Sequence, residues 1–125
     1  MRKPLYISFK PIYKNRCSLS LKNKSGERTY IVLHDVANDI SRELSFRCSK
    51  KLKVLKGTYV IEAWLEKGNI GINPENIQHV EIENIPAKHN TSFRGKRVVA
   101  DLNHDKEQLI LFNEITVADI IQRGG

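Results

Sequence analysis

Apolar and polar residues alternate along much of this sequence, a period typical of β-strands with one buried face. The alternation is clearest over residues 17–21, where serines separate apolar residues, and over residues 40–48, where Leu, Phe and Cys share one face. Residues 58–65 are rich in β-branched and aromatic side chains and are predicted to form the strongest strand. Turn-forming residues separate roughly eight such segments, which favours a β-sandwich or a barrel.

Turn residues between these segments predict two hairpins. In the first, residues 17–21 pair with residues 29–33 across the turn sequence Asn-Lys-Ser-Gly at 23–26. In the second, residues 97–102 pair with residues 108–112. Both strands of each hairpin are therefore expected to lie in the same sheet.

Glycine, asparagine and proline predict two long loops, at residues 67–76 and 86–95. A short strand is expected between them at residues 80–83, and another near the N-terminus at residues 5–9. The end of the chain, from Ile115, fits either a strand or a short C-terminal helix.

The segment Leu55-Lys-Gly-Thr-Tyr59, followed by Val60-Ile-Glu-Ala63, resembles the corner before a late strand of immunoglobulin-like and fibronectin-type sandwiches. In those proteins a leucine precedes a tight glycine turn, and a tyrosine hydroxyl bonds back to the backbone. Gly57 permits the positive φ that such a turn requires, and Tyr59 has a hydroxyl to satisfy. The resemblance covers only this corner and lacks the proline that many relatives carry before the glycine. It implies an immunoglobulin-like sandwich and carries no information on function.

Length and composition predict one domain over residues 1–125, because 125 residues fall within the usual single-domain range. A hydrophobic share of 40% and a charged share of 28% are typical of a folded chain. The apolar runs are far shorter than the ~20 residues of a membrane-spanning helix. Basic and polar residues interrupt the segment after Met1-Arg2-Lys3, so we expect no secretory signal and a cytoplasmic location, with export as the alternative.

Charge divides the chain unevenly. Residues 1–56 contain 14 Lys and Arg against four Asp and Glu, whereas residues 57–125 contain seven against ten, within a net charge of +7. This asymmetry predicts an anionic partner for the first half, either nucleic acid or an acidic protein surface. It equally fits a homo-oligomer in which the basic half of one copy docks on the acidic half of another. Solvated basic residues that protect strand edges are a further explanation.

The candidate binding residues are basic side chains in three clusters, suited to phosphate or carboxylate groups. Tyr6, Tyr13 and Phe93 lie among them and offer rings for base stacking. The clusters are Lys10, Lys14, Arg16, Lys22, Lys24 and Arg28, then Arg47, Lys50, Lys51, Lys53 and Lys56, and finally Arg94, Lys96 and Arg97.

Catalytic and metal-binding motifs do not emerge from the sequence. His34-Asp35 is one of two His–carboxylate neighbours, but adjacent residues of a strand point to opposite faces. Glu81 and Glu83 share a strand face, which is more typical of a solvent side than of a metal site. We therefore predict no enzyme activity, no metal and no cofactor. Cys17 and Cys48 share the phase of apolar neighbours and are interpreted as small buried residues, with a disulfide between them left open.

The prediction is a single antiparallel β-sandwich, immunoglobulin-like in character, that acts as a non-enzymatic binding or assembly module. Its basic N-terminal half and its two long loops are the expected contact regions. Trp64, the one tryptophan, is expected in the core or at a subunit interface. The alternatives are a small nucleic-acid-binding β-barrel and, third, a protein inhibitor or small hydrolase.

Overall fold

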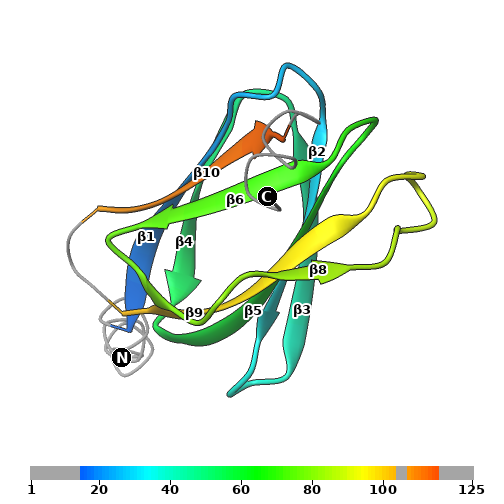
Figure 1. Cartoon of the computed structure of the whole chain (residues 1–125). Coiled ribbons are helices and arrows are strands. Elements are labelled where there is room, and N and C mark those ends of the chain that lie inside the picture. The colour runs from blue at the N-terminus through cyan, green and yellow to red at the C-terminus, as the bar shows by residue number, and fades with distance from the viewer. Residues whose placement is uncertain (1–14, 104–106, 116–125) are drawn as a thin grey trace, which may run out of the picture.

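The computed structural model describes residues 15–103 and 107–115, and within these ranges the chain forms two packed β-sheets and no helix (Figure 1). Sheet A has the strand order β4-β1-β10-β6. It is mixed, because β1 and β10 run parallel while its other pairs are antiparallel. Its strands are β1 (Arg16–Asn23), β4 (Ser49–Leu55), β6 (Ile70–Glu75) and β10 (Gln108–Glu114).

Sheet B has the strand order β3-β2-β5-β9-β7, with β8 also paired to β9. All of its pairs are antiparallel. Its strands are β2 (Thr29–Asp35), β3 (Ile40–Phe46), β5 (Gly57–Leu65), β7 (Gln78–His79), β8 (Glu83–Ile85) and β9 (Gly95–Leu102). The predicted all-β, sandwich-like architecture is confirmed, with one sheet mixed rather than purely antiparallel.

The core lies between the two sheets and is built from every second residue of the long strands. β2 shows the pattern clearly, because Thr29, Ile31, Leu33 and Asp35 are buried while the residues between them are half-buried. The same alternation runs through β5 and β9. The fully buried large side chains include Leu19, Leu21, Ile31, Ile61, Leu65, Ile70, Leu102, Ile110 and Phe112. Burial of these inner faces is the main force that holds the sheets together.

The first predicted hairpin is wrong, because β1 lies in sheet A and β2 in sheet B. The Asn23 side chain shapes the turn between them, accepting a bond from the Ser25 N–H at 3.0 Å and donating to the Glu27 carbonyl. This turn carries the chain across the core instead of back along the same sheet. Alternation cannot distinguish the two outcomes, since strands that face each other across a core also bury every second residue.

The second predicted hairpin is wrong for the same reason. β9 belongs to sheet B, whereas β10 crosses to sheet A and inserts between β1 and β6. There it pairs in parallel with β1, and Leu21 lies opposite Ile110. A parallel pairing between segments so distant in sequence leaves no local turn signal.

The predicted loop at residues 67–76 is also wrong over most of its length, because Ile70–Glu75 forms β6. Ile70 and Ile72 are buried in the core, which outweighs the turn propensity of the neighbouring Gly and Asn residues. Pro74 is accommodated because β6 is the edge strand of sheet A.

The strand expected at residues 80–83 is wrong for residues 80–82, which lie between the short strands β7 and β8, and only Glu83 belongs to a strand. The β7 register places His79 opposite Ala100, whereas the β8 register places Glu83 opposite Arg97. The register therefore shifts by one residue between them, which is the signature of a bulge. The following segment, residues 86–94, contains no strand and agrees with the predicted second loop.

The corner before β5 forms as its sequence indicates. Gly57 adopts φ 151°, and the Tyr59 hydroxyl donates a 2.7 Å hydrogen bond to the Leu55 carbonyl. Burial, followed by the negative charge of Asp35, raises the pKa of Tyr59 to about 12. The immunoglobulin-like refinement is not confirmed: that architecture keeps its first two strands in one sheet, whereas the first two strands of the described residues, β1 and β2, lie in different sheets. The expectations at residues 5–9 and for a C-terminal helix after Ile115 fall outside the described residues.

Candidate functional site

Four predicted binding residues from two separate clusters meet on the outer surface of sheet A. In the antiparallel pairing of β1 and β4, Ser18 lies opposite Lys53 and Ser20 opposite Lys51. Residues opposite each other share a face, and Leu19, on the other face, is buried in the core. The outer phase of these two strands thus contains Arg16, Lys22, Lys51 and Lys53, which we call the basic face; all four side chains are exposed.

The basic face carries no acidic neighbour within its own two strands, since neither β1 nor β4 contains an Asp or a Glu. Small serines separate its cations, and Lys53 Nζ donates a 2.9 Å hydrogen bond to Ser18 Oγ. On the outer phase of sheet A the acidic strand residue is Glu75 of β6, two strands away from β1. Positive charge is therefore concentrated over one half of this sheet.

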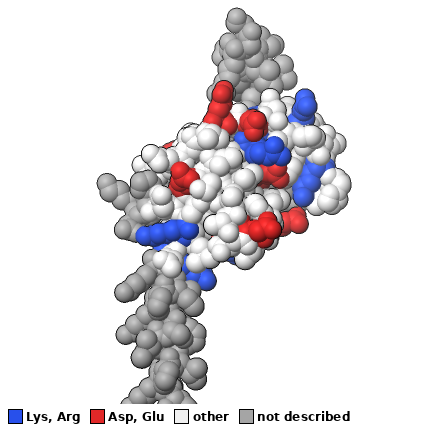
Figure 2. All heavy atoms as spheres, turned by 90° about the horizontal axis from the view of Figure 1, so that it is seen from below, with Lys and Arg blue, Asp and Glu red and all other residues white. Residues whose placement is uncertain are grey.

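The end of the sandwich shows a different distribution. Figure 2 shows Lys and Arg side chains lying among Asp and Glu side chains on the surface seen from below. On this end of the molecule the charge asymmetry of the sequence therefore does not produce a continuous basic surface.

A cleft opens beside the basic face, between the edge strands β3 and β4. It has a volume of about 250 Å³ and combines an apolar floor with three cationic side chains. Its one carboxylate, Asp35, is buried and accepts hydrogen bonds from the Asn38 backbone and side chain at 3.2 and 2.9 Å. This edge cleft is lined by Arg16, Leu33, Asp35, Ile40, Arg42, Lys53, Val54, Leu55 and Tyr59.

Arg42 is a residue of this cleft that the sequence interpretation missed. It lies on β3 in the same phase as Leu44 and Phe46, the residues that face inward. A cation in the same phase as the apolar residues of an edge strand can extend its charged end to the edge of the core. The alternation of the sequence contains this signal, because Arg42 stands at a position where an apolar residue is expected.

The remaining predicted cations of the first half are scattered. Lys24 is exposed in the β1–β2 turn, and Arg28 donates to Ser45 Oγ at 3.3 Å. Arg47 is exposed in the β3–β4 turn, and Lys50 is exposed on the inner phase of β4. Lys10, Lys14, Tyr6 and Tyr13 lie outside the described residues.

The third predicted cluster lies on sheet B and is largely engaged within the molecule. Arg97 is opposite Glu62 across β9 and β5, and its Nη2 and Nε atoms lie 2.7 and 2.9 Å from Glu62 Oε2. Lys96 Nζ donates to Asn84 Oδ1. Arg94 is exposed in the loop next to Phe93, which is 38% exposed. The structure therefore does not combine this cluster with the basic face.

The loop at residues 86–94 covers Trp64 on the outer side of sheet B. The indole Nε1–H donates to the Pro86 carbonyl at 3.0 Å, and Lys88 Nζ lies 5.0 Å from the ring centroid. Thr91 Oγ1 donates a 2.8 Å bond to the Leu65 carbonyl and fixes the loop to the end of β5. Trp64 is thus buried under its own chain on the outer side of the sheet, apart from the central core.

The two cysteines have different surroundings. Cys17 is buried as predicted, and its Sγ lies 3.4 Å from the Leu102 carbonyl. The prediction for Cys48 is wrong, because β3 ends at Phe46 and Cys48 is exposed in the following turn. Both are free thiols.

The β2–β3 turn brings together a histidine, a serine and an aspartate that the sequence did not associate. His34 Nδ1 lies 2.7 Å from Ser41 Oγ, and His34 Nε2 lies 3.4 Å from Asp39 Oδ1. The Asp39 side chain is 92% exposed. Acyl transfer needs aligned hydrogen-bond donors for an oxyanion in a site that excludes water. The surroundings of a carboxylate this exposed do not exclude water.

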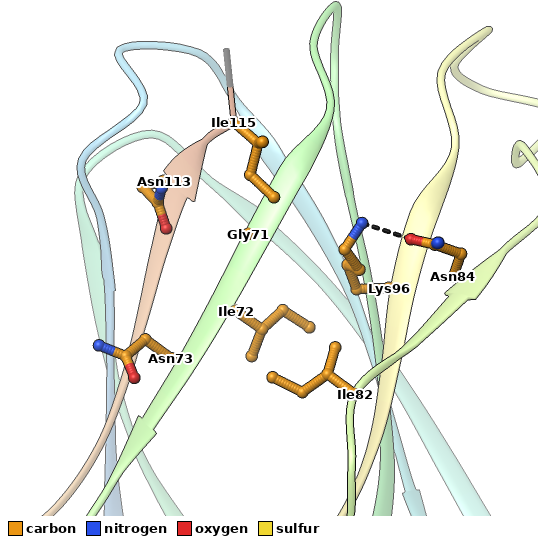
Figure 3. Close-up of a pocket in the computed structure, with 8 residues that line it drawn as sticks. All are labelled: Gly71, Ile72, Asn73, Ile82, Asn84, Lys96, Asn113 and Ile115. Carbon is orange, nitrogen blue, oxygen red and sulfur yellow. Dashed lines mark hydrogen bonds between the residues drawn. The ribbon is translucent and has the colours of Figure 1, made fainter. Parts of the chain in front are cut away.

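A second cavity, of about 540 Å³, opens at the opposite side of the sandwich between β6 and β8 (Figure 3). Ile72 of β6 and Ile82, from the segment between β7 and β8, point toward each other, and the pair formed by Lys96 and Asn84 lies above them. Its polar lining consists of Asn side chains and this lysine. Within the described ranges, no group of three or more His, Cys, Asp or Glu residues is arranged to hold a metal ion.

The described part of the chain contains no helix with the length and apolarity needed to cross a membrane. Comparison with protein-family models, with curated proteins and with solved structures finds no match to this chain. The interpretation of function therefore rests on the geometry and charge of the molecule itself.

Proposed function

We propose that this protein is a non-enzymatic binding module that binds an anionic macromolecule through the basic face. The observation that carries the proposal is the pairing of β1 with β4, which gathers Arg16, Lys22, Lys51 and Lys53 on one exposed surface without an acidic residue in either strand. Such a surface attracts a negatively charged partner and accelerates the encounter.

The positive charges of the basic face have no oppositely charged residue across the strand pair, which supports a binding role. Cross-strand pairs of opposite charge stabilise a sheet, and sheet B uses one between Glu62 and Arg97. On the basic face the residues opposite Lys51 and Lys53 are serines, so no carboxylate opposite them neutralises these cations, although Lys53 bonds to Ser18. Lysines on edge strands also hinder unwanted sheet pairing, and a binding assay separates that role from recognition.

The basic face favours recognition of charge over recognition of bases. The outer phase of β1, β4, β6 and β10 contains no aromatic residue. Single-stranded nucleic acid binders use aromatic rings as stacking platforms, so this surface is suited to phosphate or carboxylate groups instead.

Fluorescence anisotropy with labelled double-stranded DNA, RNA and polyglutamate tests the proposal, with salt raised from about 50 to 200 mM. We expect binding to at least one polyanion that weakens steeply with salt. The double variant Lys51→Glu/Lys53→Glu is expected to weaken it at least tenfold, and for DNA to lower the slope of log affinity against log salt by about 2.

A matched control separates the basic face from net charge alone. The double variant Lys67→Glu/Arg94→Glu makes the same charge change at exposed positions outside sheet A. We expect this control to retain most of the affinity. An equal loss in both variants, or no binding to any polyanion at the lowest salt concentration, would refute the proposal.

A further inference from the structure

We infer that the free edge of β4 is a docking site for an extended acidic peptide of another protein, which adds as a strand to sheet A. The inference rests on the proposed function and specifies the partner of the same basic face. Its basis is the direction of the β4 backbone groups, the charge on the residues that carry them, and the edge cleft beside them.

The backbone of β4 presents unpaired groups on the side away from β1. β4 is the terminal strand of sheet A, so among the described residues no strand pairs with its other side. Hydrogen bonds from Asn23 N–H to the Cys48 carbonyl and from Lys56 N–H to the Asn15 carbonyl, at 2.7 and 2.6 Å, mark positions 48 and 56 as pointing toward β1.

Backbone direction alternates along an antiparallel strand, so the even-numbered residues of β4 bond to β1 and the odd-numbered residues point outward. Lys51 and Lys53 therefore direct their N–H and C=O groups toward the free edge. The Leu55 carbonyl has the same phase, and it accepts a bond from Tyr59 rather than from β1. An incoming strand would find its backbone partners on Lys51 and Lys53.

The same two residues carry the charge. Their side chains lie on the outer face, so every second residue of an added strand would lie beside a lysine. Opposite charges directly across a sheet attract, and like charges repel. Acidic residues at these alternate positions are thus favoured, and basic residues are rejected.

The intervening residues of the added strand would point inward, toward the edge cleft between β4 and β3. The floor of this cleft contains Leu33 and Val54, and Ile40 at its rim is 60% exposed. Apolar side chains fill such a site, because they cover hydrophobic surface that is otherwise partly wet. A phosphate chain would leave this cleft empty. The matching partner is an extended segment in which acidic and apolar residues alternate. In strand addition generally, backbone hydrogen bonds give affinity and the alternate side chains give specificity.

The molecule disfavours a second copy of itself at this edge. Pairing of β4 with β4 would place lysines next to lysines. The acidic edge at the far side of sheet B, near Glu81 and Glu83, is interrupted by the bulge between β7 and β8, which disrupts regular pairing. We therefore assign the added strand to a different protein.

The test uses a short fluorescent peptide in which Glu and Val alternate, and a peptide of the same composition with the Glu and Val residues in separate blocks. We expect the alternating peptide to bind at least tenfold more tightly. Lys51→Glu/Lys53→Glu should abolish this preference. In native-state hydrogen exchange, the peptide should slow exchange of the Lys51 and Lys53 amides, a readout that needs no variant.

A proline substitution isolates the backbone contact. Lys53→Pro removes an outward N–H that makes no bond to β1, and Lys53→Gln removes the same charge while keeping that N–H. We expect Lys53→Pro to bind the alternating peptide several-fold more weakly than Lys53→Gln. Equal binding of the two peptides, or unchanged exchange at Lys51 and Lys53, would overturn the strand-addition inference. Salt-sensitive polyanion binding that persists in that case leaves the proposed function standing, and its absence refutes both.

Discussion

The outer surfaces of the two sheets differ in whether their charged and large side chains contact other parts of the molecule. On sheet B, Arg97 pairs with Glu62 at 2.7 Å, and the loop at residues 86–94 packs over Trp64. On sheet A, β1 and β4 expose basic side chains without acidic ones, and the separating residues are serines. Sheet B therefore satisfies its outer groups internally, whereas sheet A leaves them to solvent or to a partner. Under the proposed function, this difference places the partner on sheet A and the stabilising outer contacts on sheet B.

The largest expected effect on stability comes from removing a large side chain on the outer face of each sheet. Trp64→Ala should lower the free energy of unfolding by about 3–5 kcal/mol, because the loop loses the ring that it covers. Leu111→Ala, at a half-buried position on the outer phase of sheet A, should cost only about 1 kcal/mol. Urea unfolding followed by far-UV circular dichroism measures both. Similar costs for the two variants would mean that the outer face of sheet B is no better packed than that of sheet A.

Glycines on the two outer faces provide a second comparison. A Cβ at Gly95 would lie 2.4 Å from the Ala63 carbonyl oxygen and 2.6 Å from Trp64 Nε1, whereas one at Gly71 would first meet the Asn113 side chain at 2.8 Å. The backbone and the buried indole cannot move easily, but the exposed Asn113 amide can rotate away. Gly95→Ala should therefore cost about 2 kcal/mol and Gly71→Ala less than about 0.5 kcal/mol in chemical denaturation. The reverse order would contradict the tight approach at Gly95.

Tyr59 lies on the inner side of sheet B and serves as a reference that neither outer face affects. Tyr59→Phe removes the bond to the Leu55 carbonyl and should cost about 1 kcal/mol near neutral pH. The pKa of Tyr59 is raised to about 12 from its ordinary value of 10.0, so its stabilising contribution is complete below pH 10 and is lost as pH rises toward 12. The stability difference between wild type and Tyr59→Phe should shrink over this interval. A constant difference would indicate an unperturbed phenol.

The smallest expected effects concern single charges. Glu62→Gln should destabilise the fold by about 0.5–1 kcal/mol, because Arg97 loses its partner at a site where the Glu62 side chain is only 24% exposed. Lys51→Gln should leave stability unchanged within about 0.3 kcal/mol, since Lys51 has a serine opposite it. Thermal unfolding at low and high salt measures both changes, and added salt should reduce the Glu62→Gln effect. A clear loss in Lys51→Gln would show that the basic face contributes to folding.

Individual residues show how far the candidate site was predictable. The sequence predicted Lys51 and Lys53 as members of a basic cluster, but it did not predict β4, the strand that exposes them, because lysines dominate this short segment. The proximity of Arg16 and Lys22 to them did not follow from the sequence either, because it depends on β1 pairing with β4 rather than with the segment that follows it. Pairing partners across more than 25 intervening residues leave no mark in local sequence patterns.

The sequence by itself determined most of the strands, the core-facing phase of residues such as Leu19 and Leu21, and the tyrosine bond that closes the Leu55–Tyr59 corner. It did not determine β4 or β6. The features that it determined depend on local backbone preferences and on a period of two, and both are encoded within a few residues. Only the tertiary structure decided which strands share a sheet, since the turn after Asn23 and the crossing from β9 to β10 serve the same burial pattern in either sheet. Burial depends on facing an apolar surface and not on which strand supplies it, so the position of the basic face emerges only when the two sheets are assembled.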